Sequence, residues 1–269
     1  MKQFTRKHPI AYCIIYLFCA LLLKKLVMVP IQCSNTSLMI ANFAELLILC
    51  VEIGITWLVV RKADLVSSVP FHYHRVGKGL LWGIPGILMV ALILYLNVEG
   101  NFWSDVPLLI VYTMKNFSIG LMEESIIRGL FLGLMMLCWK GQNHGCYKAV
   151  FLSSLIFAFG HLGNLLNGDV NRVIVQVIYA FFLGVFFAAI TLQSNNLWGA
   201  VIIHSLIDFA AGIGKLIVNT SSVVSQSKQP VTSFSITKIL TNDSLLIALP
   251  IFIYGVIAMI LYQRRKSKQ

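Results

Sequence analysis

The chain has 269 residues, of which 58% are hydrophobic and 12% are charged, with a formal net charge of +11 and a mean hydropathy of +0.83. Soluble globular domains carry roughly 45–50% apolar and about 25% charged residues, so this composition excludes a soluble domain and a disordered chain. The net charge would suggest a nucleic-acid partner only if the basic residues covered a soluble surface, and their positions along the chain exclude this class as well.

Apolar segments of membrane-spanning length recur along the whole chain, since a spanning helix needs about 20 mostly apolar residues. In chain order they are approximately 10–31, 38–60, 79–96, 106–122, 149–162, 173–193, 197–218 and 244–262. The fifth is short and is expected to extend into its flanks, and the fourth is followed by a further apolar stretch, 126–138. The sequence therefore predicts an all-α fold: one transmembrane helical bundle of about eight spans over residues 1–269, without a separate soluble domain.

The lysines and arginines predict how this bundle lies in the membrane. If the amino terminus is cytoplasmic, the cytoplasmic pieces hold 13 basic residues and the opposite loops hold 3. The cytoplasmic pieces are 1–9, 61–78, 139–148, 194–196 and 263–269. This asymmetry follows the positive-inside rule with both termini cytoplasmic, and it accounts for the net charge without a nucleic acid. The lipid bilayer is therefore the expected partner, and the first segment is expected to be retained as a span.

Charged side chains within apolar segments each cost roughly 2.5–3.5 kcal/mol on insertion scales, so each needs a reason. The first group is Glu123, Glu124 and Arg128. Glu124 and Arg128 are four residues apart, share a helical face and can pair, whereas Glu123 points about 140° away from Arg128. When this segment is considered alone, a purely structural ion pair that fixes the helix register explains it as well as a functional site does.

Two of the six histidines, His161 and His204, lie within apolar segments. Phe157 precedes His161 by four residues, and Asp208 follows His204 by four, so each pair shares a helical face. Either histidine alone could be a core residue with its hydrogen bonds satisfied. Together with the glutamates, however, they place acids and histidines on three separate segments, which predicts a polar centre inside the bundle. Glutamate and histidine are the usual groups for activating water.

The three motifs, in this order and on apolar segments, resemble the CPBP family of intramembrane proteases. That family contains the type II CAAX prenyl endopeptidases and bacterial relatives linked to bacteriocin processing and self-immunity. Its pattern E-E-x-x-x-R, F-x-x-x-H and H-x-x-x-N or H-x-x-x-D matches Glu123-Glu124-…-Arg128, Phe157-…-His161 and His204-…-Asp208. The resemblance covers about residues 105–215, and it extends to Gly129 and to Leu197-Trp198-Gly199.

This resemblance implies an endopeptidase that hydrolyses a peptide bond of a membrane-associated protein or peptide. By analogy with the family, Glu123 and His161 activate a water molecule, and His204 and Asp208 stabilise the oxyanion. In a second version, His204 joins Glu123 and His161 around a zinc ion, because two histidines and a glutamate make up one kind of catalytic zinc site. The sequence leaves both the metalloprotease and the metal-free version open.

The same resemblance assigns supporting roles to three further residues. Glu124 and Arg128 pair with each other, while Phe157 packs against the centre and shapes substrate access. The sequence departs from the family pattern at Ile127, where an aromatic residue is common, and at Asp208, where asparagine is more frequent. The glutamates and both histidines of the pattern are in place.

Two other classes of function remain open at this point. A binding protein of the same family, acting in immunity or regulation, would keep the polar core as structure. A proton-coupled transporter would use acids and histidines as a relay, although no inverted repeat is visible. The H-E-x-x-H and G-x-S-x-G motifs are absent, which excludes two common hydrolase classes. The short loops and the basic tail favour a bacterial plasma membrane, while the substrate, its prenylation and the oligomeric state stay open.

Overall fold

The computed structural model of the chain describes residues 2–33, 36–62, 75–97, 106–166, 169–219, 235–240 and 242–266. Every element within these ranges is a helix, which confirms the predicted all-α class. The elements are α1 (Lys2–Lys7), α2 (Pro9–Cys33), α3 (Leu38–Lys62), α4 (Val76–Trp82), α5 (Ile84–Asn97), α6 (Val106–Glu124), η3 (Ser125–Leu132), α7 (Gly133–Cys138), α8 (Gly145–Gly160), η4 (His161–Leu166), α9 (Val170–Ser194), α10 (Trp198–Asn219), α11 (Ile236–Leu240) and α12 (Asp243–Lys266).

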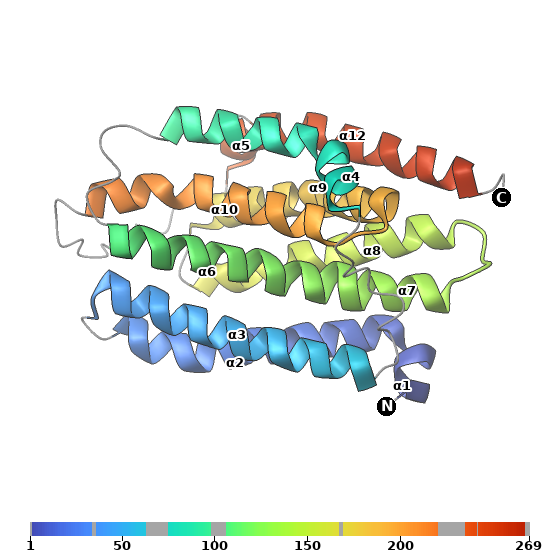
Figure 1. Ribbon diagram of the computed structural model, residues 1–269, viewed down its shortest axis with the longest axis horizontal. Helices are drawn as coiled ribbons and strands as arrows, with labels where there is room; N and C mark the ends of the chain where they lie inside the picture. The colour runs from blue at the N-terminus through green and yellow to red at the C-terminus, as the bar shows by residue number, and fades with distance from the viewer. Residues whose placement is uncertain are drawn as a thin grey trace.

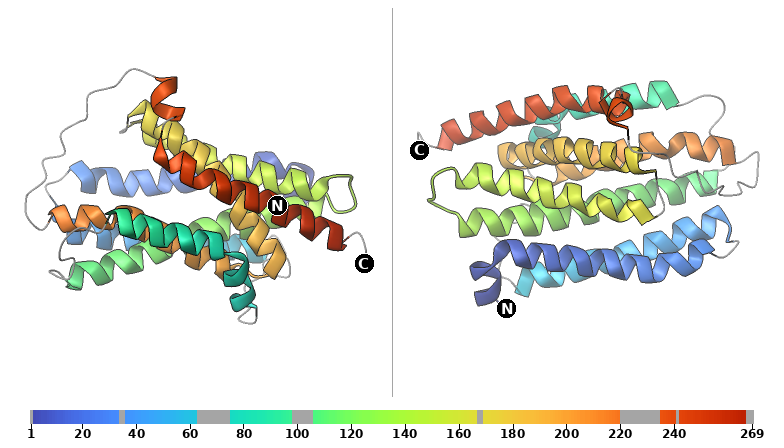
Figure 2. Two further views of the ribbon diagram at one scale, coloured as in Figure 1. Left: turned by 90° about the horizontal axis from the view of Figure 1, so that it is seen from above. Right: turned by 180° about the vertical axis from the view of Figure 1, so that it is seen from behind.

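The long helices run side by side along one axis of the molecule (Figure 1). α9 packs against α8 and α12, and α6 packs against α3 and α10. α2 and α3 form one edge of the bundle, whereas α5 and α12 lie at the opposite edge (Figure 2). The three helices that carry the motifs, α6, α8 and α10, therefore lie between these edges.

Apolar side chains occupy both the inside and the outside of this bundle. Leu130, Phe131 and Ala188 are fully buried, while Phe18 and Phe43 are exposed on α2 and α3. Large exposed apolar side chains along whole helices are unusual in a soluble protein but typical of helices that face lipid. The surface therefore agrees with the membrane location predicted from the composition.

Within the described residues, five helical stretches are long and apolar enough to cross a membrane. They are Pro9–Ile31, Met39–Lys62, Gly145–Leu165, Val170–Ser194 and Asp243–Lys266. A sixth candidate consists of α4 and α5, which meet at a bend of 67°. The third stretch confirms that the predicted segment 149–162 extends into its flanks. The predicted segments 106–122 and 197–218 form α6 and α10 but are not among these candidates, so eight spans stay a prediction.

The two ends of the chain lie at the same end of the bundle (Figure 1). This arrangement is the one expected if both termini lie on the same side of a membrane. Their cytoplasmic location stays a prediction from the basic residues. Parts of the loops used in that prediction, at 63–74 and 220–234, lie outside the described residues.

The first motif lies in a longer helix than the sequence predicted. α6, η3 and α7 form one helical run from Val106 to Cys138, although the sequence predicted two apolar stretches interrupted by Glu123, Glu124 and Arg128. These charged residues do not end the helix because they find partners inside the bundle.

Candidate active site

The first motif lies where α6 continues into η3. Arg128 Nη1 donates to Glu124 Oε1 at 2.9 Å, and both side chains are fully buried. Arg128 Nη2 donates to the carbonyl oxygen of Gly184 on α9 at 3.1 Å. The predicted pairing of Glu124 with Arg128 is therefore confirmed, and the guanidinium joins η3 to α9 as well.

The π-helical conformation of η3 begins directly after Glu124. All residues from Ser125 to Leu132 are buried. π-turns inside longer helices are rare and are frequently found at functional sites, because the wider turn changes which side chains share a face. Here the wider turn still allows the contact between Glu124 and Arg128, while the sequence treated this segment as a regular α-helix.

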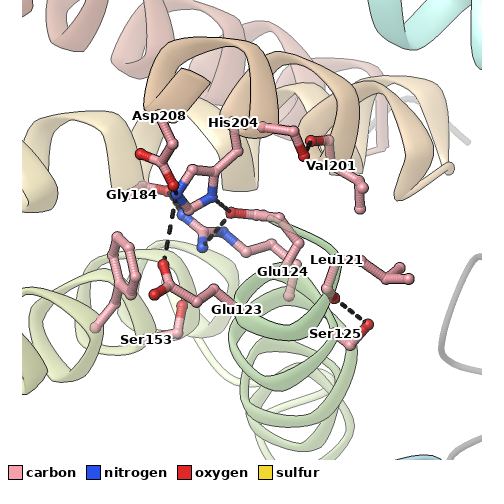
Figure 3. Close-up of polar contacts among 12 residues, drawn as sticks. Leu121, Glu123, Glu124, Ser125, Ser153, Gly184, Val201, His204 and Asp208 are labelled. Atoms are coloured by element: carbon pink, nitrogen blue, oxygen red, sulfur yellow. Dashed lines mark hydrogen bonds and ion pairs between the residues drawn. The ribbon is translucent and has the colours of Figure 1, made fainter. Parts of the chain in front are cut away.

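His204 on α10 is the residue on which Glu123 and Glu124 of the first motif and Asp208 of its own motif converge (Figure 3). Its Nδ1 lies 2.7 Å from Glu124 Oε1. Because a carboxylate only accepts hydrogen bonds, this Nδ1 carries the proton and donates. Its Nε2 lies 3.4 Å from Glu123 Oε2 and 3.5 Å from Asp208 Oδ2. One imidazole thus joins α6 to α10 and presents its second nitrogen between two carboxylates.

Aromatic rings enclose this polar centre on two sides. The ring of Phe187 stacks on the His204 ring, with the centroids 5.1 Å apart, and the Arg128 guanidinium lies over Phe187 at 5.3 Å. Phe157 lies 5.1 Å from the same guanidinium and contacts His204 edge-on. Cations over aromatic faces gain electrostatic energy, especially where water is excluded. The predicted packing role of Phe157 is thus shared with Phe187, which belongs to no motif.

His161 lies at the end of α8, where the chain enters η4. Its Nδ1 lies 3.1 Å from the carbonyl oxygen of Phe157, so this nitrogen donates and Nε2 is left as an acceptor. The ring packs edge-on against Phe157 with centroids 4.9 Å apart and lies within electrostatic range of Asp208. Phe157 thus contacts both His161 and His204 and connects the second motif to the centre.

The centre has a sealed side and an accessible side. The side chains of Glu124 and Arg128 are 0% exposed, and that of His204 is 8% exposed. In contrast, 26% of the Glu123 side chain and 34% of the Asp208 side chain are exposed. The exposed side of the centre is therefore that of Glu123 and Asp208, while Glu124 and Arg128 form its buried side.

Small residues bring the helices close enough for these contacts. A Cβ atom added to Gly120 on α6 would overlap the hydroxyl of Ser205 on α10, next to His204. A Cβ added to Gly184 would lie 2.9 Å from the Cβ of Ser154 on α8. Sequence reasoning missed these residues, although Gly120 lies one helical turn before Glu124 and Ser205 directly follows His204. Small side chains at such positions let two membrane helices approach closely.

The second version of the site, with Glu123, His161 and His204 around zinc, can be tested against this geometry. In the part of the chain that the structure describes, no group of three His, Cys, Asp or Glu side chains is arranged to hold a metal ion. His161 Nδ1 donates to a carbonyl oxygen and His204 Nδ1 to Glu124, and zinc-binding histidines commonly hold their second nitrogen in this way, so these two hydrogen bonds do not exclude a metal at Nε2. As placed, Glu123, His161 and His204 are not gathered as a set of zinc ligands, so the metal version stays a prediction, and the reaction steps below are assigned to the carboxylates and imidazoles themselves.

The fold and the site define a class of protein: a helical membrane protein with a buried Glu–Arg–His centre that is accessible from the side of Glu123 and Asp208. Among protein families, the model described as Type II CAAX prenyl endopeptidase Rce1-like matches residues 103–210. This range contains all three motifs, so the resemblance to that family is confirmed over it. Comparisons with curated proteins and with solved structures give no match.

Proposed function

We propose that the protein is an intramembrane endopeptidase that hydrolyses a peptide bond of a membrane-associated protein or peptide. The observation that carries this proposal is the position of the Glu123 and Asp208 carboxylates, at 3.4 and 3.5 Å from His204 Nε2 on the accessible side of the centre. The family match over residues 103–210 supports the same activity. A bacterial plasma membrane is the location proposed from the short loops and the basic tail.

In the proposed reaction, Glu123 is the general base. Its carboxylate takes a proton from a water molecule, whose oxygen attacks the carbonyl carbon of the scissile bond. Glu123 then returns the proton to the leaving nitrogen, so that a carboxyl and an amino terminus are formed. His161 assists by accepting a hydrogen bond from the same water at Nε2. A positioned base of this kind contributes about 10²–10⁴-fold to the rate.

His204 is proposed to stabilise the negative charge that develops on the carbonyl oxygen by donating from Nε2, and Asp208 is proposed to support this role by favouring the protonated ring. Glu124 holds the Nδ1–H of His204 at 2.7 Å, so the ring is oriented with Nε2 toward the accessible side. The donating form of the ring carries N–H groups on both nitrogens, and the three neighbouring carboxylates offset its positive charge. Loss of one such donor costs about 10²–10³-fold in rate in other hydrolases.

The direct test uses purified protein in liposomes together with peptides anchored in the same bilayer, with and without a prenyl group. New peptide termini are identified by mass spectrometry, and Glu123→Gln protein at the same level is the control. We expect cleavage by the wild type and none by the variant. Peptide binding without new termini would favour an immunity or regulatory protein. A pH change in the liposome lumen without cleavage would favour a transporter.

A further inference from the structure

A cleft with one buried carboxylate lies between α2 and α3, outside the three motifs. A cleft of about 130 Å³ opens between these helices, and we refer to it as the α2–α3 cleft. Its lining is Tyr16, Cys19, Ala20, Leu23, Glu52 and Ile55. The walls are therefore mostly apolar and contain one carboxylate.

Glu52 is buried, and one oxygen of its carboxylate lacks a hydrogen-bond partner in the described part of the chain. Its side chain is 4% exposed, and Oε2 has no hydrogen-bond partner among the described residues. Lys24 attracts the Glu52 charge, but its ammonium is ion-paired with Glu45 at 2.9 Å. Glu45 also has the ammonium of Lys115 at 3.6 Å. A carboxylate buried at membrane depth without a partner is costly, so this arrangement needs a reason.

The other polar groups of the cleft bind one another and leave the carboxylate free. The hydroxyl of Tyr16 lies 2.8 Å from Thr56 Oγ1, and Thr56 Oγ1 donates to the backbone oxygen of Glu52 at 2.7 Å. Both hydroxyls thus have partners, and neither bond involves the Glu52 carboxylate. Glu52 Oε2 therefore keeps unused hydrogen-bonding capacity at the wall of the cleft.

The lining specifies the chemistry of that ligand. Apolar walls fit an aliphatic chain, and a carboxylate at the wall fits a cationic head. Lysine and arginine side chains combine these two features, whereas a purely apolar chain would leave the carboxylate unpartnered and an anion would be repelled. α3, which carries Glu52, packs against α6 and η3, the helices that carry the first motif.

We propose that the α2–α3 cleft binds a lysine or arginine side chain of the peptide substrate through Glu52. This inference rests on the proposed endopeptidase function. It assigns Glu52 to substrate selection and not to the hydrolytic step.

The first experiment measures kcat/KM for membrane-anchored peptides that differ at one position, with lysine, norleucine or glutamate scanned along the chain. At one position we expect lysine to be favoured over norleucine by about 10–100-fold, since a hydrogen bond to a charged group contributes about 1.5–3 kcal/mol. Glu52→Gln should abolish this preference, so that the lysine and norleucine peptides are turned over with equal kcat/KM. Gly54→Ala is the matched control on α3, because a Cβ there would meet nothing within 4 Å. Absence of a lysine preference at every position, or its persistence in Glu52→Gln, would overturn the inference.

The second experiment does not depend on proteolysis. Cys19 lines the cleft and is exposed, so a variant with Cys19 as its only cysteine can be modified with methanethiosulfonate reagents of matched size and opposite charge. The thiolate displaces methanesulfinate and forms a mixed disulfide. We expect faster modification by the cationic reagent, and loss of this selectivity in Glu52→Gln. A variant with only Cys50, which is exposed on α3, should show no dependence on Glu52.

The two experiments separate the inference from the proposed function. Cleavage without a lysine preference overturns the inference and leaves the endopeptidase proposal in place. If no peptide is cleaved, the endopeptidase proposal fails, and the modification rates of Cys19 then test the cleft by itself. A preference for the cationic reagent that depends on Glu52 supports a cation-binding cleft. Equal rates with the cationic and anionic reagents overturn it.

Discussion

Two ion pairs at membrane depth differ in what surrounds them. Arg128 and Glu124 pair at 2.9 Å with both side chains 0% exposed, and the guanidinium also contacts Gly184 and two aromatic rings. Lys24 and Glu45 pair at the same 2.9 Å, but their side chains are 27% and 21% exposed. Glu45 also has Lys115 as a second cation, 3.6 Å away.

The N···O distance is the same in both pairs, so this distance alone does not determine how much unfolding free energy is lost when one partner is removed. Where one partner of a sealed pair is removed, the other is left as an uncompensated buried charge. Where the pair is partly accessible and a second cation is present, the remaining charge can find another partner. The centre and the α2–α3 region should therefore respond very differently to the same kind of substitution.

The largest effect is expected for Glu124→Ala. Arg128 loses its carboxylate while it stays fully buried, which costs about 3–5 kcal/mol in other proteins. Protein level and thermal stability in detergent should fall together with activity. The neighbouring Glu123→Ala should keep a wild-type level, because Glu123 is partly exposed and is not the ion-pair partner of Arg128. A stable and fully active Glu124→Ala protein would contradict the sealed role of this residue.

The accessible side of the centre is tested at Asp208. Asp208→Leu should lower kcat by about 100-fold, because the group beside His204 Nε2 can no longer form hydrogen bonds. Asp208→Asn should stay within about tenfold of the wild type, since the amide keeps hydrogen-bonding atoms at the same place. Both rates are measured on the same anchored peptide at equal protein level. If the two variants are equally active, Asp208 has no role in the polar chemistry.

The close approach of α6 and α10 is tested at Gly120. Alanine at this position would overlap the Ser205 hydroxyl and push the two helices apart, at a cost of about 1–3 kcal/mol for an overpacked core. Activity should fall as well, since Glu124 and His204 meet across this contact. Gly54→Ala is again the matched control. Unchanged melting temperature and activity in Gly120→Ala would show that the helices accommodate the methyl group.

The smallest effect is expected for Lys24→Met. The remaining Lys115 still lies near Glu45, so the loss should be about 1 kcal/mol, as for partly exposed ion pairs. Thermal unfolding of this variant beside Glu124→Ala compares the two ion pairs directly. A loss in Lys24→Met as large as that in Glu124→Ala would remove the distinction between them.

The sequence was sufficient to predict the helical class and the pairing of Glu124 with Arg128, because both follow from local rules of hydrophobicity and helical spacing. It also predicted that acids and histidines from three segments would share one centre. The contact between His204 and Glu124 could not be assigned, since these residues are 80 positions apart and meet only through the packing of α6 on α10.

Other features had no signal in the sequence that could be recognised. Phe187 is one of several aromatic residues in α9, and only its stacking on His204 distinguishes it. The partners of two lysines in the first apolar segment could not be assigned either: Lys24 binds Glu45, and Lys25 donates to the carbonyl oxygen of Gly163 at 2.9 Å. Long-range partners of this kind are set by the fold.

The central claim is that Glu123 and His204 act together in one hydrolytic centre. It is tested most directly by kcat for an anchored peptide in Glu123→Gln, His204→Ala and the double variant, all at equal protein level. Each single substitution should lower kcat by about 10²–10⁴-fold. The double variant should be no more than about threefold slower than the slower single variant, because residues that act as a unit show non-additive losses. Wild-type cleavage by His204→Ala, or losses that multiply in the double variant, would contradict the claim.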